Sequence, residues 1–148
     1  MKIVYARTGT SPYDRMFVSF LASNHEVDMV TVDMPTNQVY QSMRLAPNQV
    51  RIHGGDWKRY WRRPIPAALI RDCFGLGTVC NEIARSAPDI IISGWIPTYG
   101  FYAAMSGFHP HVLLIWGSDV LLLPRRSRSH LLKTLFTLRV ADMVVVDS

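Results

Sequence analysis

Cysteine is scarce in this chain, and its few histidines and cysteines do not occur at a spacing typical of metal ligands. The two cysteines, Cys73 and Cys80, lie seven positions apart in one predicted helix. Two helical turns separate their α-carbons by about 10 Å, which is beyond the reach of a disulfide. We therefore interpret both cysteines as core residues and expect neither a redox centre nor a bound metal.

Long apolar runs and secretory features are also missing. No apolar stretch of the sequence reaches the roughly 20 residues that a membrane-spanning helix needs. Residues 1–5 pass directly into a strand-like run without the design of a signal peptide. A cytoplasmic protein is therefore expected.

The two commonest nucleotide-binding motifs are absent. The sequence contains neither G-x-G-x-x-G nor G-x-x-x-x-G-K-S/T, so neither the dinucleotide fingerprint nor the Walker loop is present. Gly75 and Gly77 resemble half of such a motif, but no predicted strand precedes them. We assign these glycines to helix packing.

What the sequence does contain is the composition of one ordinary domain, predicted to span residues 1–148, with an excess of positive charge. Hydrophobic residues make up 49% of the chain, enough to bury a core. The formal net charge of +5 indicates anionic surroundings, which fit phosphates, nucleic acid or an acidic membrane face.

Short apolar runs alternate with helical patterns along the chain, which predicts an α/β fold. Strands are expected at residues 2–6, 27–32, 50–53, 89–93, 112–116 and 143–146. Helices are expected around the apolar stripe of residues 16–21, from 66 to 87, from 99 to 105 and from 129 to 140, with the rest of 33–66 and the basic segment 125–128 as loops. The repeated strand–helix–strand order implies a doubly wound, mostly parallel, Rossmann-like sheet with helices on both faces.

The strand at 112–116 ends abruptly in Gly117-Ser118-Asp119. Ligands of open α/β sheets lie at the carboxyl ends of the strands, so this turn is a candidate site. The same three residues are equally consistent with the cap of a structural turn, in which Gly117 takes a positive φ. After the first strand, the loop 8–11 leads into a helix amino end, where a phosphate would be stabilised.

Between residues 51 and 63 basic side chains alternate with Trp57, Tyr60 and Trp61. This mixture is typical of an anionic lipid interface and of single-stranded nucleic-acid binding. It is also consistent with a solvated surface loop. With Arg125, Arg126 and Arg128, the segment is expected to form one basic face.

Several segments share an order and spacing with one known family: 89–93, the strand ending Trp116-Gly117-Ser118-Asp119-Val120, and 138–148, together with 13–17 and 24–27 in the opening strand–helix–strand unit. They resemble the amino-terminal domain of retaining GT-B glycosyltransferases of family 4, the "glycosyl transferase group 1" proteins. The resemblance implies a two-domain enzyme in which this half binds the acceptor, while a carboxyl-terminal half that is absent from this chain binds the nucleotide sugar. The isolated chain is then expected to be inactive.

The implied reaction transfers a sugar from a nucleotide-sugar donor to an acceptor hydroxyl with retention, without a metal or other cofactor. Trp116 stands where many relatives place a histidine, and an indole cannot accept a proton. Asp119 is therefore the catalytic candidate of this half. The backbone of Gly9 and Thr10 is expected on the donor-diphosphate side, and the acceptor-binding candidates are Asp14, Trp95, Thr98, Tyr99, Trp116, Gly117 and Ser118.

The expected partners are a nucleotide-sugar donor held by the missing domain or a partner subunit, an acceptor sugar or lipid-linked acceptor, and an anionic membrane surface with peripheral attachment at the inner face. No nucleic acid is expected. Two alternatives stay open. One is a flavodoxin-like module that binds FMN through the loop 8–11, and the other is a non-catalytic subunit for acceptor binding or membrane docking.

Overall fold

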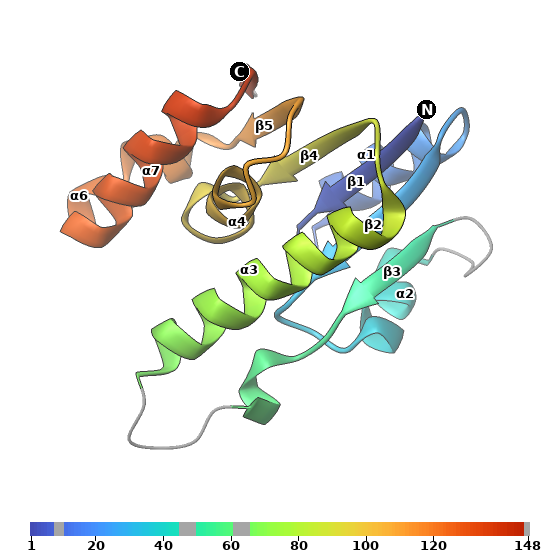
Figure 1. Cartoon of the computed structure of the whole chain (residues 1–148), viewed down its shortest axis with the longest axis horizontal. Helices are drawn as coiled ribbons and strands as arrows, with labels where there is room; N and C mark the ends of the chain where they lie inside the picture. The colour runs from blue at the N-terminus through green and yellow to red at the C-terminus, as the bar shows by residue number, and fades with distance from the viewer. Residues whose placement is uncertain (8–10, 45–49, 61–65, 147–148) are drawn as a thin grey trace.

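The computed structural model describes residues 1–7, 11–44, 50–60 and 66–146 (Figure 1). One six-stranded sheet runs through the molecule in the order β3-β2-β1-β4-β5-β6, and every neighbouring pair is parallel. The strands are β1 (Lys2–Ala6), β2 (Glu26–Thr31), β3 (Arg51–Gly54), β4 (Ile90–Gly94), β5 (His111–Ile115) and β6 (Met143–Val146). The predicted doubly wound parallel sheet is confirmed.

The strand order also decides between two fold predictions. A flavodoxin-like sheet has the order 2-1-3-4-5, which places β1 beside β3. Here β1 lies between β2 and β4, as in the Rossmann order. The flavodoxin-like alternative is therefore wrong for this chain.

Helices cover both faces of the sheet (Figure 1). The first two, α1 (Pro12–Ala22) and α2 (Thr36–Met43), lie on one face with Val18, Leu21 and Val39 in the core. The opposite face carries α3 (Ala67–Ser86), the π-helical turn η2 (Ile96–Gly100), α4 (Phe101–Met105) and α7 (Arg128–Val140). Short connections are made by η1 (Trp57–Tyr60), α5 (Gly117–Leu121) and α6 (Leu123–Arg126). Among the described residues, none of the helices has the length and apolar character of a membrane span.

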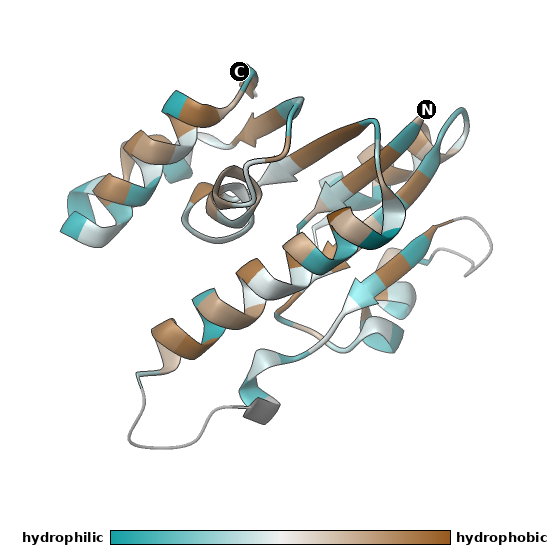
Figure 2. Cartoon of the chain, in the orientation of Figure 1, coloured by the Kyte–Doolittle hydropathy of each residue, from teal (hydrophilic) through white to brown (hydrophobic). Residues whose placement is uncertain are grey.

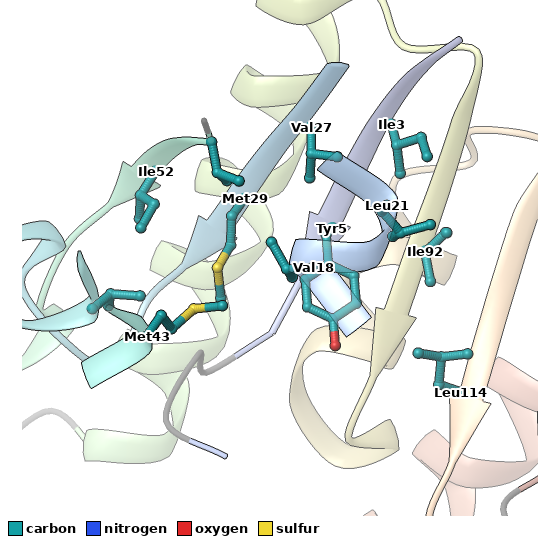
Figure 3. Packing of buried hydrophobic residues seen from close by; sticks show 12 residues of the cluster. Ile3, Tyr5, Val18, Leu21, Val27, Met29, Met43, Ile52, Ile92 and Leu114 are labelled. Carbon is teal, nitrogen blue, oxygen red and sulfur yellow. The ribbon is translucent and has the colours of Figure 1, made fainter. Parts of the chain in front are cut away.

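The central strands β1, β4 and β5 are apolar because both of their faces are buried. Successive side chains point to opposite faces, so Ile3 and Tyr5 pack under α1 while Val4 and Ala6 pack under α3. Figure 3 shows the α1 side, where Val18 and Leu21 lie over the apolar residues of β1, β2 and β4. In Figure 2 β4 and β5 are correspondingly brown along much of their length, whereas the edge strand β3 is largely teal.

Helix α1 packs only part of its predicted face, Phe17 and Leu21, against the sheet. It begins at Pro12 with a capping box formed by Ser11 and Asp14, and it buries Asp14, Val18 and Leu21 at helical spacing. Met16 and Phe20, which the sequence placed in the core stripe, are 72% and 70% exposed.

Helix α3 is rotated relative to its predicted face. Its buried residues are Gly75, Val79, Glu82 and Ser86, a stripe too polar to be recognised as a core face. Cys73 and Cys80 are exposed free thiols, so their prediction as core residues is wrong. The assignment of Gly75 to helix packing is confirmed, because a Cβ there would lie 2.2 Å from the Tyr102 ring.

Two predicted loops contain helices. Residues 33–66 include α2 and η1 as well as the expected edge strand β3. The predicted turn 117–119 lies in α5, and the predicted loop 125–128 contains the end of α6 and the start of α7. Helix α5 begins at Gly117 without the positive φ expected for that glycine. Helices α2, α5 and α6 are each eight residues or shorter, too brief to leave a clear hydrophobic period.

Candidate active site

The candidate site lies at the carboxyl ends of β1, β4 and β5. From β1 the chain winds outward through β2 to β3, whereas from β4 it winds the other way through β5 to β6. The winding direction therefore changes between β1 and β4, where Ala6 pairs with Ser93. Such a switch point is where open α/β sheets hold ligands.

Arg7 follows β1 at this switch point and is almost completely buried. Its guanidinium carbon lies 3.5 Å from the centre of the Trp116 ring, and its Nη1 lies 2.9 Å from Oδ1 of Asp14. A Cβ on Gly94 would stand 3.2 Å from the Arg7 side chain, so glycine leaves room for it. Arg7 thus links the ends of β1, β4 and β5 to the start of α1.

Asp14 is fully buried beneath this arginine. Its Oδ1 also accepts a hydrogen bond of 2.8 Å from the Tyr5 hydroxyl. Burial is the main cause that raises the pKa of Tyr5, and the carboxylate of Asp14 adds to it. The phenol therefore stays protonated and keeps donating its hydrogen bond to Asp14. Asp14, a predicted acceptor-binding residue, has no exposed surface and supports Arg7 and Tyr5 from inside.

Asp119 occupies the first turn of α5 and is also fully buried. Its Oδ2 lies 3.4 Å from the backbone nitrogen of Ile96, which donates to it, and its Oδ1 accepts from the Ser118 hydroxyl at 3.3 Å. Burial raises the pKa of Asp119, although these donors and the charge of Arg7 oppose the rise. The carboxylate therefore joins the turn after β5 to the turn after β4.

The turn after β4 carries three predicted acceptor-binding residues, Trp95, Thr98 and Tyr99, which differ in their exposure to solvent. Trp95 has a φ of +60° and is 37% exposed at the rim. Thr98 and Tyr99 point inward and are buried, and the Tyr99 hydroxyl donates to Asp33 at 2.7 Å. Of the three, Trp95 alone presents a surface that a ligand can touch.

Trp116 and Ser118 are half-buried, and Gly117 is exposed between them. Trp116 also borders a groove of about 560 Å³ between α1 and the ends of β5 and β6. The groove is lined mainly by apolar and aromatic side chains, namely Tyr5, Tyr13, Met16, Phe17, Phe20, Leu114, Ile115, Trp116, Val145 and Val146. It shares Tyr5 and Trp116 with the polar cluster, so the groove directly adjoins that cluster. Gly9 and Thr10 lie outside the described residues.

A second polar cluster lies at the other edge of the sheet, between β2, β3 and α3. One ligand atom each from Asp28, His53 and Glu82 lies within 4.8 Å of the others. Two arginines bind these three side chains. Arg51 donates to Asp28 at 2.6 Å, and Arg85 lies 2.7 Å from both Glu82 and His53. The cluster is an ion-pair network in this structure.

This network changes the interpretation of the basic and aromatic segment 51–63. Arg51 pairs with Asp28 and Glu26, and His53 faces Glu82, so both are engaged within the sheet edge. Residues 61–63 of the segment lie outside the described residues.

Sequence reasoning missed Arg7 and Tyr5. A single basic residue after a strand has no distinctive pattern, and the tyrosine is one residue of an apolar run. The available signal was position, since Arg7 directly follows the first strand of a fold whose switch point adjoins that strand.

Comparison with known proteins agrees with this architecture. The family model described as "Glycosyl transferase 4-like" matches residues 2–148, and no match is found among the curated proteins. A solved structure assigned as a UDP-N-acetylglucosamine 2-epimerase from Listeria monocytogenes is similar over 99% of this chain and 39% of its own, with a TM-score of 0.65 and 14% identity.

A second similar structure is UGT2 of Phytolacca americana, solved with UDP-2fluoro-glucose and pterostilbene. It matches 99% of this chain and 48% of its own, with a TM-score of 0.58 and 11% identity. The chain thus spans two fifths to a half of the length of these structures. At such low identity the likeness shows a shared fold.

Proposed function

Because the chain belongs to the glycosyl transferase 4-like family, we propose that it is the acceptor-side half of a GT-B glycosyltransferase. The proposed reaction moves a sugar from a nucleotide-sugar donor to an acceptor hydroxyl, with retention at the anomeric carbon and without a metal or other cofactor. The donor is assigned to a second domain or a partner subunit. The observation that carries the proposal is the meeting of Arg7, Trp116 and Asp119 at the switch point of the sheet.

In this reaction the acceptor oxygen bonds to the anomeric carbon while the bond to the diphosphate breaks, and the acceptor proton has to leave. Arg7 provides a permanent positive charge close to the reacting edge, which favours groups that become more negative. Asp119 is the proposed catalytic carboxylate. Its raised pKa makes it a better proton acceptor than an ordinary aspartate, and its burial means that the turn 116–119 has to open toward the acceptor.

The rim supports a specific acceptor arrangement. The exposed surface of Trp95 suits stacking against a sugar ring, and the groove beside Trp116 has the volume and apolar lining of a small-molecule site. An acceptor sugar carried on an apolar or lipid group fits both features.

The test replaces Asp119 with asparagine in protein that includes the donor half. The amide oxygen of Asp119→Asn still accepts from the Ile96 backbone, so the melting temperature should stay close to that of the parent. Transfer should fall by roughly 10²-fold or more, the scale of a lost acid–base group. The readout is sugar transfer and diphosphate release at matched protein concentrations.

Asp142→Asn is the matched control, because Asp142 is exposed and accepts from the backbone of His111 at the amino end of β5, away from the crevice. It should retain full transfer. Full activity of Asp119→Asn would show that Asp119 only caps a turn. An inactive complete parent protein would instead favour the non-catalytic subunit.

A further inference from the structure

Helix α7 exposes its apolar side and buries polar residues. Its buried residues are Thr134 and Thr137, whereas Leu131, Leu132 and Leu135 are 41%, 66% and 57% exposed. A surface helix of a globular protein normally shows the opposite arrangement. In Figure 2 brown hydrophobic positions recur along this helix.

Arginines stand at both ends of the leucines. Arg128 and Arg139 are exposed, and the three- and four-residue spacings from 128 to 139 place them on the same helical stripe as the leucines. We call these five residues, Arg128, Leu131, Leu132, Leu135 and Arg139, the α7 outer face. It combines apolar surface with positive charge.

The charge around this face is of one sign. Residues 120–141 contain five basic residues and no acidic residue. Of the five, Lys133 turns inward to Asp72 at 2.5 Å, and the four arginines are exposed. Arg125 and Arg126 belong to α6, which packs directly against α7. Exposed Leu121 and Leu122 add apolar surface at the preceding turn.

We propose that the α7 outer face docks on an anionic lipid bilayer. Leucines on an interfacial helix enter the boundary between headgroups and acyl chains, while arginines extend their charged ends to anionic headgroups. Anionic lipid supplies the negative charge that this part of the chain lacks. A second copy docked face to face would instead bring arginine against arginine, which is unfavourable.

The position of this face differs from the one expected from sequence. The described part of the first segment, residues 51–60, begins in the edge strand β3, whereas α7 packs beside α4 and β6 follows it at the opposite edge of the sheet. In Figure 1 α6 and α7 form one outer flank, far from β3 and α2. Strand β3 and the arginines of α6 and α7 therefore lie at opposite edges of the sheet, and the leucines of α7 are the part that sequence reasoning left out.

Vesicle sedimentation tests the proposal. The protein should pellet with phosphatidylcholine vesicles that contain about a quarter phosphatidylglycerol and should bind pure phosphatidylcholine far more weakly. Because surface electrostatics are screened at high ionic strength, about 0.5 M salt should release most of the bound protein. Equal binding to both vesicles at every salt concentration would overturn the proposal.

Two double variants separate charge from apolar contact. Arg128→Gln/Arg139→Gln should weaken binding to anionic vesicles roughly 30-fold, at about fivefold per arginine. The matched control Arg15→Gln/Lys58→Gln removes the same charge from exposed residues elsewhere and should bind like the parent. An equal loss in both variants would show that net charge, and not this face, causes binding.

Leu132→Gln/Leu135→Gln should weaken binding about tenfold or more. Both leucines are exposed, so the variant should melt near the parent temperature. Analytical ultracentrifugation completes the test. A parent dimer that this leucine variant dissociates would reassign the face to contact between copies and overturn lipid docking.

Discussion

His111 makes the stability of the fold depend on pH. It lies fully buried at the start of β5 with its Nε2 2.7 Å from the Ser93 hydroxyl, and burial lowers its pKa to about 4 from 6.5. Between these values the unfolded chain binds a proton that the folded protein excludes. The free energy of unfolding should therefore fall by up to about 3 kcal/mol as the pH drops through this window. Above the unfolded pKa the neutral His111 carries no such penalty.

Urea unfolding at about pH 7 and about pH 5 measures this slope. His111→Gln should flatten it, although part remains because burial also lowers the pKa of His53. His53→Gln is the comparison, and it should remove only that remaining part. A slope that His111→Gln leaves unchanged would mean that His111 is protonated without cost in the folded protein.

At the level of single residues, sequence predicts place better than orientation. Trp95 and Trp116 were expected at the carboxyl edge because strand ends meet there, and the structure places them at that edge. The burial of Tyr99 could not be foreseen, because it depends on a π-helical turn that points the ring inward to Asp33. Arg7 was missed because its significance comes from partners on three other segments.

The packing of α3 on α4 makes two nearby glycines unequal. Gly75 faces Tyr102, whose ring would lie 2.2 Å from an added Cβ, whereas nothing lies within 4 Å of a Cβ on Gly77. Gly75→Ala should lower the free energy of unfolding by about 1–3 kcal/mol, since the helices have to separate. Gly77→Ala should raise it by about 0.5–1 kcal/mol through better helix propensity.

Urea denaturation of both variants beside the parent tests this pair. Each is the other's control, because the substitution and the helix are the same. Similar stability changes in the two variants would contradict the close approach of α3 and α4 at Gly75.

Among the elements, those with a single strong pattern could be predicted. Strands such as β4 and β5 are apolar because both faces are buried, and α7 and β6 were predicted nearly to the residue. The short helix α2 buries only Val39 and Met43, so the sequence shows no clear helical period of apolar residues there. The face of α3 was misassigned because packing selected Gly75 and an ion-paired Glu82 over the cysteines.

On the scale of the whole molecule, residues 1–148 alone should not transfer sugar. In the proposed enzyme half of the groups that stabilise the transition state belong to the donor side. The measurement is release of nucleoside diphosphate from a panel of nucleotide sugars, with and without acceptor candidates. Turnover of any donor by this chain alone would contradict the proposed division of labour.

The central position of β1 has a consequence for the chain as it is synthesised. Its partner β2 follows at once, but its other neighbour pairs Ile90 with Ile3, 87 positions further on. At about 5–20 residues per second, the 40 residues from the end of β3 to the end of β4 take roughly 2–8 s to be made. For those seconds the nascent chain holds β1 with one edge open, and the face of β1 that α3 covers stays bare until that helix has been made. A chaperone can bind this stretch, and another unfinished chain can pair with it.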